Sequence, residues 1–326
     1  MADMTHFPAH AAAPAAVAAP VAKAIGYRRA IDLARFLAAA GIVWDHARAP
    51  YADIGYVSLA LFLMLTSFLA VQSYERASPA DTGTRRFWLS RARRIAMPWL
   101  FWSVVYFFVH HWVTDDEGPW WQIDPFTLLI GSSLHLWFLP FVMIALVLIP
   151  PMARTIRTPA AVWLACGGLI ALSLPLAWVS LPIAWVENSG AFNEPLPQWA
   201  FSLPLFLYGA IAALARRLDM VALPVATAGI ISLGEYLIEP GFGSVQMIIV
   251  ALLFEALWRW NLKGAWATVL AGLAFGVYLV HPFFMLVAFK FLGTDTDRTT
   301  IGLFTLLASV IGTMVLQRLP LVRRFV

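Results

Sequence analysis

The chain is divided into apolar segments, each close to the length that a helix needs to cross a membrane. About 20 helical residues span the ~30 Å of hydrocarbon in a bilayer. Hydrophobic residues make up 61% of the 326 residues and charged residues only 12%, a balance that excludes a water-soluble protein. The sequence therefore predicts an all-α fold, a polytopic integral membrane helix bundle. We expect about ten transmembrane helices, at residues 29–48, 52–74, 92–113, 134–153, 160–184, 198–215, 219–237, 243–260, 265–291 and 299–318.

The first 26 residues form a different region of the chain. They are rich in alanine and proline and contain no apolar stretch typical of a signal peptide or a span. We expect residues 1–26 to be a disordered cytoplasmic tail and residues 27–326 to form the ten-helix transmembrane domain. The single cysteine, Cys166, excludes an intramolecular disulfide and a cysteine metal cluster.

Positive charges follow the predicted topology. Most of the 22 lysine and arginine residues lie on the side of the membrane that holds both termini. They are found in the two terminal segments and in every second connection between the predicted spans. On the opposite side lie only Arg48, Lys290 and Arg298. Because short cytoplasmic loops retain positive residues during insertion, both termini are predicted to be cytoplasmic. The net charge of +4 is small, and the membrane topology explains where the positive residues lie. No nucleic-acid partner is therefore expected.

The first predicted span contains two polar residues on one stripe. Arg35 and His46 are eleven residues apart, which returns to within about 20° of the same helix face and separates them by roughly 16 Å. Ionisable groups inside a span cost about 2.5–3.5 kcal/mol and commonly face a cavity or carry function. This pattern favours a reaction that uses a cation and a titratable base at different membrane depths. The alternative is that both residues reach toward the interfaces, with Asp32 pairing with Arg35.

A cluster of arginines precedes and opens the third predicted span. Arg91 and Arg94 share a helix face and could bind a polyanion such as a phosphate group. The alternative is a role in membrane insertion or in binding anionic lipid. Other arginines of the cluster are Arg85, Arg86 and Arg93.

The ninth predicted span contains a tyrosine, a histidine and a proline in close succession. Tyr278 and His281 share a face, and Pro282 removes the hydrogen-bond donor for the carbonyl four residues earlier. The alternative for His281, and equally for His135, is an interfacial hydrogen-bonding residue. The histidines lack HxxxH or HExxH spacing, so no metal site is predicted.

Four motifs, taken in order along nearly the whole span region, resemble those of the membrane-bound acyltransferase 3 family. They are Arg35 with His46 eleven residues later, Arg91-x-x-Arg94 followed by Pro98, Leu136-Trp137-Phe138-Leu139, and Tyr278-x-x-His281-Pro282.

The resemblance implies an acyl-CoA-dependent O-acyltransferase. Its expected reaction moves an acyl group, most often acetyl from cytoplasmic acetyl-CoA, to a hydroxyl of a glycan such as an exopolysaccharide or of another cell-envelope acceptor. It also implies that His46 is the catalytic histidine with Arg35 as its motif partner. Candidate coenzyme A contacts are Arg86, Arg91, Arg93, Arg94, Tyr278 and His281. The expected location is the lipid bilayer of a bacterial inner membrane, and no oligomeric state is predicted.

Two departures and three alternatives accompany this interpretation. Residues 66–69 lack the glycine that the family often has in the second span, and residues 132–135 lack a carboxylate that many members carry before the fourth. A transporter or flippase of a lipid-linked glycan would use a similar cavity without bond chemistry. Within the enzyme class, a succinyl or longer acyl donor is open. So is the choice between direct transfer, with His46 as general base, and transfer through an acyl-histidine.

Overall fold

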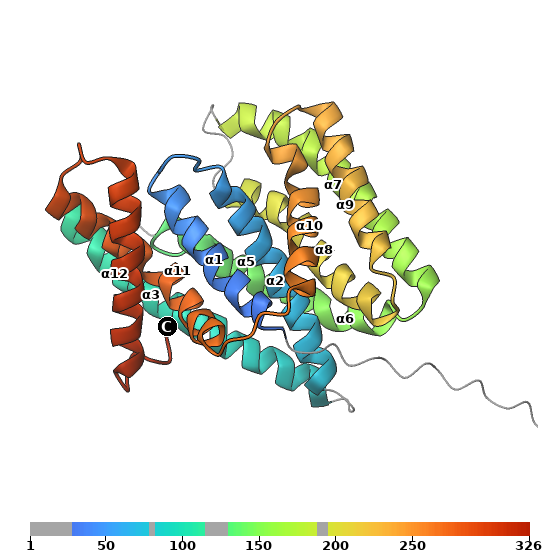
Figure 1. The fold of residues 1–326 in the computed structure, drawn as a ribbon, viewed down its shortest axis with the longest axis horizontal. Coiled ribbons are helices and arrows are strands. Elements are labelled where there is room, and N and C mark those ends of the chain that lie inside the picture. Colours follow the sequence, from blue (N-terminus) through green and yellow to red (C-terminus); the bar gives the residue numbers. More distant parts are fainter. Residues whose placement is uncertain (1–27, 78–81, 115–129, 188–194) are drawn as a thin grey trace, which may run out of the picture.

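The computed structural model describes residues 28–77, 82–114, 130–187 and 195–326, which form helices joined by short connections (Figure 1). The predicted tail, residues 1–26, lies outside the described residues and stays a prediction. The α-helices are α1 (Arg29–His46), α2 (Ile54–Ala77), α3 (Thr82–Thr114), α5 (Phe138–Ala145), α6 (Ile149–Thr155), α7 (Pro159–Glu187), α8 (Leu196–Arg217), α9 (Ala222–Ile238), α10 (Gln246–Arg259), α11 (Trp266–Leu292) and α12 (Arg298–Arg318). Short 3-10 turns are η1 (Leu134–Trp137), η2 (Leu146–Leu148) and η3 (Gly243–Val245).

The all-α polytopic fold is confirmed. Because η1, α5, η2 and α6 follow one another without a break from Leu134 to Thr155, the described residues form ten helical rods, one at each predicted span. Six are long and apolar enough to cross a membrane: Ile54–Arg76, His135–Thr155, Pro159–Ala177, Leu196–Arg217, Trp266–Leu292 and Arg298–Arg318. The other four are α1 and α3, which carry several charged residues, and α9 and α10, which are short at 17 and 14 residues.

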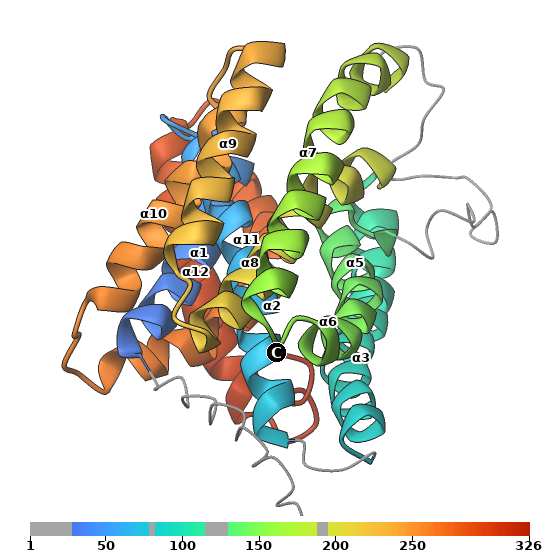
Figure 2. The ribbon, with the colours of Figure 1, turned by 90° about the vertical axis from the view of Figure 1, so that its right-hand side faces the viewer.

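The helices alternate in direction, so the connections gather at two ends of the bundle (Figures 1 and 2). One end holds the start of α1, the connections near 156–158, 218–221 and 260–265, and the C-terminus. We call it the terminal end. The other, the loop end, holds the connections 47–53, 239–242 and 293–297.

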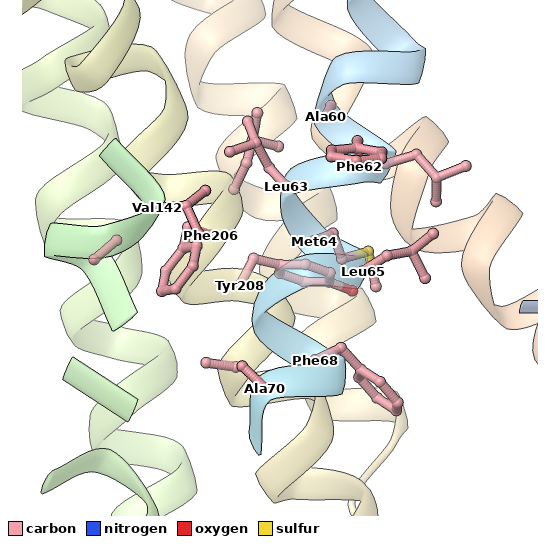
Figure 3. Close-up of a cluster of buried hydrophobic side chains, with 14 of the residues drawn as sticks. Ala60, Phe62, Leu63, Met64, Leu65, Phe68, Ala70, Val142, Phe206 and Tyr208 are labelled. Atoms are coloured by element: carbon pink, nitrogen blue, oxygen red, sulfur yellow. The ribbon is translucent and has the colours of Figure 1, made fainter. Parts of the chain in front are cut away.

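Helix α2 lies at the centre of the bundle and contacts α1, α3, α6, α8 and α10. Its side chains Leu63, Met64 and Phe68 are completely buried, and they pack in one cluster with Phe206 and Tyr208 of α8 (Figure 3). In a bilayer, lipid tails are as apolar as these side chains, so close van der Waals packing holds such helices together.

Small residues let the central helices approach closely. A Cβ atom at Gly209 of α8 would lie 2.3 Å from the main-chain oxygen of Met64 on α2. One at Gly41 of α1 would lie 1.9 Å from the Ser58 hydroxyl oxygen on α2. Glycine at these two positions is therefore required by the α2–α8 and α1–α2 contacts, as is common where membrane helices cross.

Helix α1 is packed between α2 and α11, and α11 is packed in turn on α12. Gly276 of α11 lies against Thr313 of α12, where a Cβ atom would meet the threonine methyl at 2.2 Å. Val43 of α1 packs in one buried cluster with Ala274 and Val277 of α11, and contacts of this kind set the register of α1 along α11. They bring His46, the last residue of α1, beside the proline-containing middle of α11.

Candidate active site

Two predicted site residues, 235 positions apart in the chain, form a hydrogen bond. His46 Nδ1 lies 2.7 Å from His281 Nε2, and the two rings are stacked with their centroids 4.9 Å apart. His281 is completely buried, whereas His46 is exposed. The pair therefore has one fixed member and one accessible member.

The carbonyl of Tyr278 determines where the proton sits on His281. Pro282 has no N–H, so the helix cannot supply its usual donor to the carbonyl four residues earlier. His281 Nδ1 occupies this position, 2.7 Å from the Tyr278 carbonyl oxygen. Because a carbonyl oxygen only accepts, Nδ1 of His281 carries the hydrogen and donates it.

The same reasoning assigns the proton on His46. A neutral imidazole has one donor and one acceptor nitrogen, so His281 Nε2 is an acceptor. His46 Nδ1 must then donate to it, which leaves His46 Nε2 without a hydrogen. The hydrogen-bonded chain from the Tyr278 carbonyl through His281 to His46 thus presents an oriented, unprotonated nitrogen on an exposed ring. This arrangement suits a general base.

Asp45, the residue before His46, does not take part in this chain. Its side chain packs on the main chain of α2, where a Cβ atom at Gly55 would lie 2.0 Å from Asp45 Cβ. His46 Nδ1 is bonded to His281 instead. This agrees with the helical geometry, in which consecutive residues point about 100° apart.

A second layer of polar aromatic residues surrounds His281, and the sequence did not reveal its role. The ring of His135 meets the ring of His281 edge-on at 5.3 Å, and its Nδ1 lies 2.9 Å from the Ser133 hydroxyl. Tyr278 donates its hydroxyl to the His135 carbonyl, and Tyr106 donates to the Leu279 carbonyl at 2.7 Å. The buried, polar His135 was a visible signal, whereas Tyr106 lies in an aromatic run without one.

The histidine geometry differs from that of a metal site. Two imidazole nitrogens bound to one zinc ion at 2.0–2.1 Å in tetrahedral geometry would lie about 3.3 Å apart. The nitrogens of His46 and His281 are closer, at hydrogen-bonding distance. Within the described ranges, no group of three potential ligands is placed to hold a metal ion.

The predicted arginines gather near the terminal end. Arg91 is half-buried and its guanidinium lies over the ring of Phe87 at 5.5 Å. Burial, and then the positive charges of Arg94, Arg35 and Arg76, lower the pKa of the Arg91 guanidinium. Three helices, α1, α2 and α3, therefore contribute to one cationic cluster, and Arg35 of the first motif lies near the arginines of the second.

The remaining arginine candidates lie at the surface. Arg86, Arg93 and Arg94 of α3 are exposed, as is Arg85. They extend the positive region along the first half of α3, which begins at the terminal end. The structure thus separates the predicted residues into a cationic cluster and a histidine pair, joined by α1.

Comparison with known proteins agrees with this architecture. Residues 28–318 match the profile of the acyltransferase 3 family, which is described as an acyltransferase domain. No curated protein and no solved structure shows a significant match to the chain.

The fold and the site define a multi-pass integral membrane protein whose candidate site residues lie on α1, α3 and α11. The match covers nearly all of the described bundle, so the chain belongs to the acyltransferase 3 family and is a membrane acyltransferase. An acyl donor, an acceptor and the bilayer are its partners.

Proposed function

We propose that this enzyme transfers an acetyl group from acetyl-CoA to a hydroxyl of a glycan or of another cell-envelope acceptor. The observation that carries this proposal is the bond of His46 Nδ1 to His281 Nε2, 2.7 Å long, which leaves the exposed His46 with a free Nε2. A base of this kind is what attack by a hydroxyl on a thioester requires.

In the proposed reaction, His46 Nε2 accepts the proton of the acceptor hydroxyl as the oxygen attacks the thioester carbonyl. The tetrahedral intermediate collapses with cleavage of the carbon–sulfur bond. The coenzyme A thiolate then takes the proton from the His46 imidazolium, which regenerates the neutral base. Throughout the cycle His46 Nδ1 keeps its hydrogen and its bond to His281, so the ring does not need to turn.

The cationic cluster supports binding of the donor at the terminal end. Arginine is suited to phosphate because its planar guanidinium donates two parallel hydrogen bonds. Arg91 and Arg94, with Arg35 beside them, would hold the coenzyme A phosphates. About 16 Å of helix rise separates Arg35 from His46, so the pantetheine arm would run along α1 between the two groups.

The charge distribution supports an orientation for the bundle. The terminal end holds most of the positive residues, and the loop end holds Arg48, Lys290 and Arg298. By the positive-inside rule the terminal end faces the cytoplasm, where acetyl-CoA is made, in a bacterial inner membrane. His46, at the loop end of α1, then faces the envelope acceptor.

Two finer alternatives belong to the same enzyme class. Transfer through an acyl-histidine would use the same free Nε2 as a nucleophile. A succinyl or longer donor would use the same arginines, because they contact the phosphates and not the acyl group. Membership in an acyltransferase family favours either over a transporter that makes no bonds.

The test is transfer of radiolabel from acetyl-CoA by purified protein, with water and a mixed glycan pool as acceptors. We expect His46→Ala to lose transfer and thioester hydrolysis, and Arg91→Ala to need more acetyl-CoA. The matched control is His111→Ala, because His111 is an exposed histidine at the end of α3. Full activity in a folded His46→Ala protein would overturn the proposed mechanism.

A further inference from the structure

A cavity of about 370 Å³ lies between α7, α8, α9 and the start of α10, apart from the histidine pair. Its lining includes none of the residues of α1 or α11. Two carboxylate residues, Glu235 and Glu239, lie at the end of α9 beside the connection 239–242, so the cavity is in the loop-end half of the bundle. His46 is at the loop end of α1 as well.

Two buried polar side chains on this lining lack partners. Ser173 of α7 is 1% exposed and Gln246 of α10 is 2% exposed. In the described part of the chain, neither the Ser173 hydroxyl oxygen nor Gln246 Nε2 has a hydrogen-bond partner. Native proteins rarely leave such groups unpaired, so the cavity has the features of a site that a polar ligand completes.

The chemistry of the lining selects the kind of ligand. The carboxylates of Glu235 and Glu239 only accept hydrogen bonds when ionised, whereas Gln246 Nε2 only donates. An ammonium group would satisfy the carboxylates and leave the amide unpaired, and an anion would do the reverse. A ligand hydroxyl group both donates and accepts, so it can pair with the carboxylates, with the amide and with the Ser173 hydroxyl, which itself donates and accepts.

The apolar part of the lining fits the same ligand. Phe201 and Pro204 of α8 and Met247 of α10 line the cavity together with the polar groups. Sugars carry hydroxyls around their rim and C–H groups on their faces, so they match a site that combines both kinds of surface. Among the described residues no lysine or arginine lines the cavity, so the lining offers a phosphate group no cationic side chain.

We propose that this cavity binds a sugar-like polyhydroxylated ligand. Its assignment as the anchor for a non-reacting part of the acceptor rests on the proposed function. In that role it would supply binding energy at a distance from the reacting hydroxyl, as remote contacts do in many enzymes. The binding itself does not depend on catalysis.

The experiment measures binding of maltotriose and of N,N′-diacetylchitobiose to the full-length protein in lipid nanodiscs by saturation-transfer NMR. It uses the His46→Ala protein as well as the unmodified one. We expect at least one probe to bind both proteins. We expect Gln246→Leu to raise the Kd about tenfold, because it removes one well-made hydrogen bond. Ser173→Ala provides a second variant with a smaller change in shape. Gln317→Leu is the control, because Gln317 lies on α12 and bonds to the Gly272 carbonyl.

The outcomes separate this inference from the proposed function. The cavity assignment would be overturned if neither probe binds, or if the Gln246→Leu and Ser173→Ala proteins bind the probes as tightly as the unmodified protein. Either result would overturn it even if His46-dependent thioester hydrolysis is intact. Binding of ethanolamine in place of the sugars would also overturn it. Sugar binding by an unmodified protein that shows no acyl transfer would support the cavity and count against the reaction.

Discussion

Replacing His281 tests the link between the histidine pair and the chemistry. His281→Phe keeps an aromatic ring, slightly larger than imidazole, but His46 Nδ1 loses its acceptor and the Tyr278 carbonyl loses its donor. Nothing then fixes the tautomer of His46, so Nε2 is no longer held without its hydrogen. We expect kcat to fall while the KM for acetyl-CoA stays near its original value, because the arginines that would bind the donor are unchanged.

The size of the effect has two bounds. Loss of one hydrogen bond, at about 0.5–1.5 kcal/mol, accounts for roughly 2- to 13-fold. Complete loss of a general base costs about 10²- to 10⁴-fold. A ring that still reaches the substrate but is only part of the time in the required tautomer falls between these limits, so we expect about 10²-fold.

The assay is steady-state hydrolysis of acetyl-CoA by the folded variant, with initial rates measured over a range of acetyl-CoA concentrations. An unpaired buried carbonyl costs about 1–3 kcal/mol, so thermal unfolding must show that the protein is intact at the assay temperature. His281→Gln keeps an acceptor for His46 Nδ1 and is expected to recover part of the lost kcat. An unchanged kcat in folded His281→Phe would refute the positioning role. A raised KM at constant kcat would instead support the cofactor contact predicted for this residue from the sequence.

Three further substitutions probe the bundle and the donor site. Gly209→Ala places a Cβ atom 2.3 Å from a main-chain oxygen of α2 and should lower stability by about 1–3 kcal/mol in thermal unfolding; Gly167→Ala, with nothing within 4 Å, should be neutral. Pro282→Ala restores an N–H that competes with His281 for the Tyr278 carbonyl, so kcat should fall several-fold without loss of thermal stability, and a protein that is merely destabilised would contradict this. Arg91→Ala should raise the KM for acetyl-CoA about tenfold at nearly constant kcat, and an unchanged KM in initial-rate assays would remove it from the donor site.

Much of the fold follows from the sequence because hydrocarbon thickness imposes a length on each helix. The ten rods lie where the apolar segments predict them, and the basic connections share one end. The shortness of α10, 14 residues against a predicted span of 243–260, reflects the 3-10 turn η3 at its start. Local periodicity carries no information about such a change in helix type.

The site is only partly visible in the sequence, because helix periodicity says which residues share a face but not which faces meet. Pro282 predicts a carbonyl without a partner, and the structure shows that His281 donates to it. The contact of His46 with His281 depends on the register of α1 along α11, which the packing of Val43 in one buried cluster with Val277 helps to set. Likewise, the approach of Arg35 to Arg91 depends on how α1 and α3 lie relative to each other, which helix periodicity does not reveal.

The use of a main-chain carbonyl to orient the histidines affects the charge of the site. Many catalytic histidines are oriented by a carboxylate, which would add a negative charge among the helices at a cost of about 2.5–3.5 kcal/mol. Here both hydrogen bonds of His281 go to uncharged groups, the Tyr278 carbonyl and the ring of His46. In its resting state the pair is electrically neutral, and charge arises only while a proton is held during turnover. The histidine pair itself then places no permanent ion in the bilayer, and in the resting enzyme the two rings can pack between α1 and α11 as an uncharged unit.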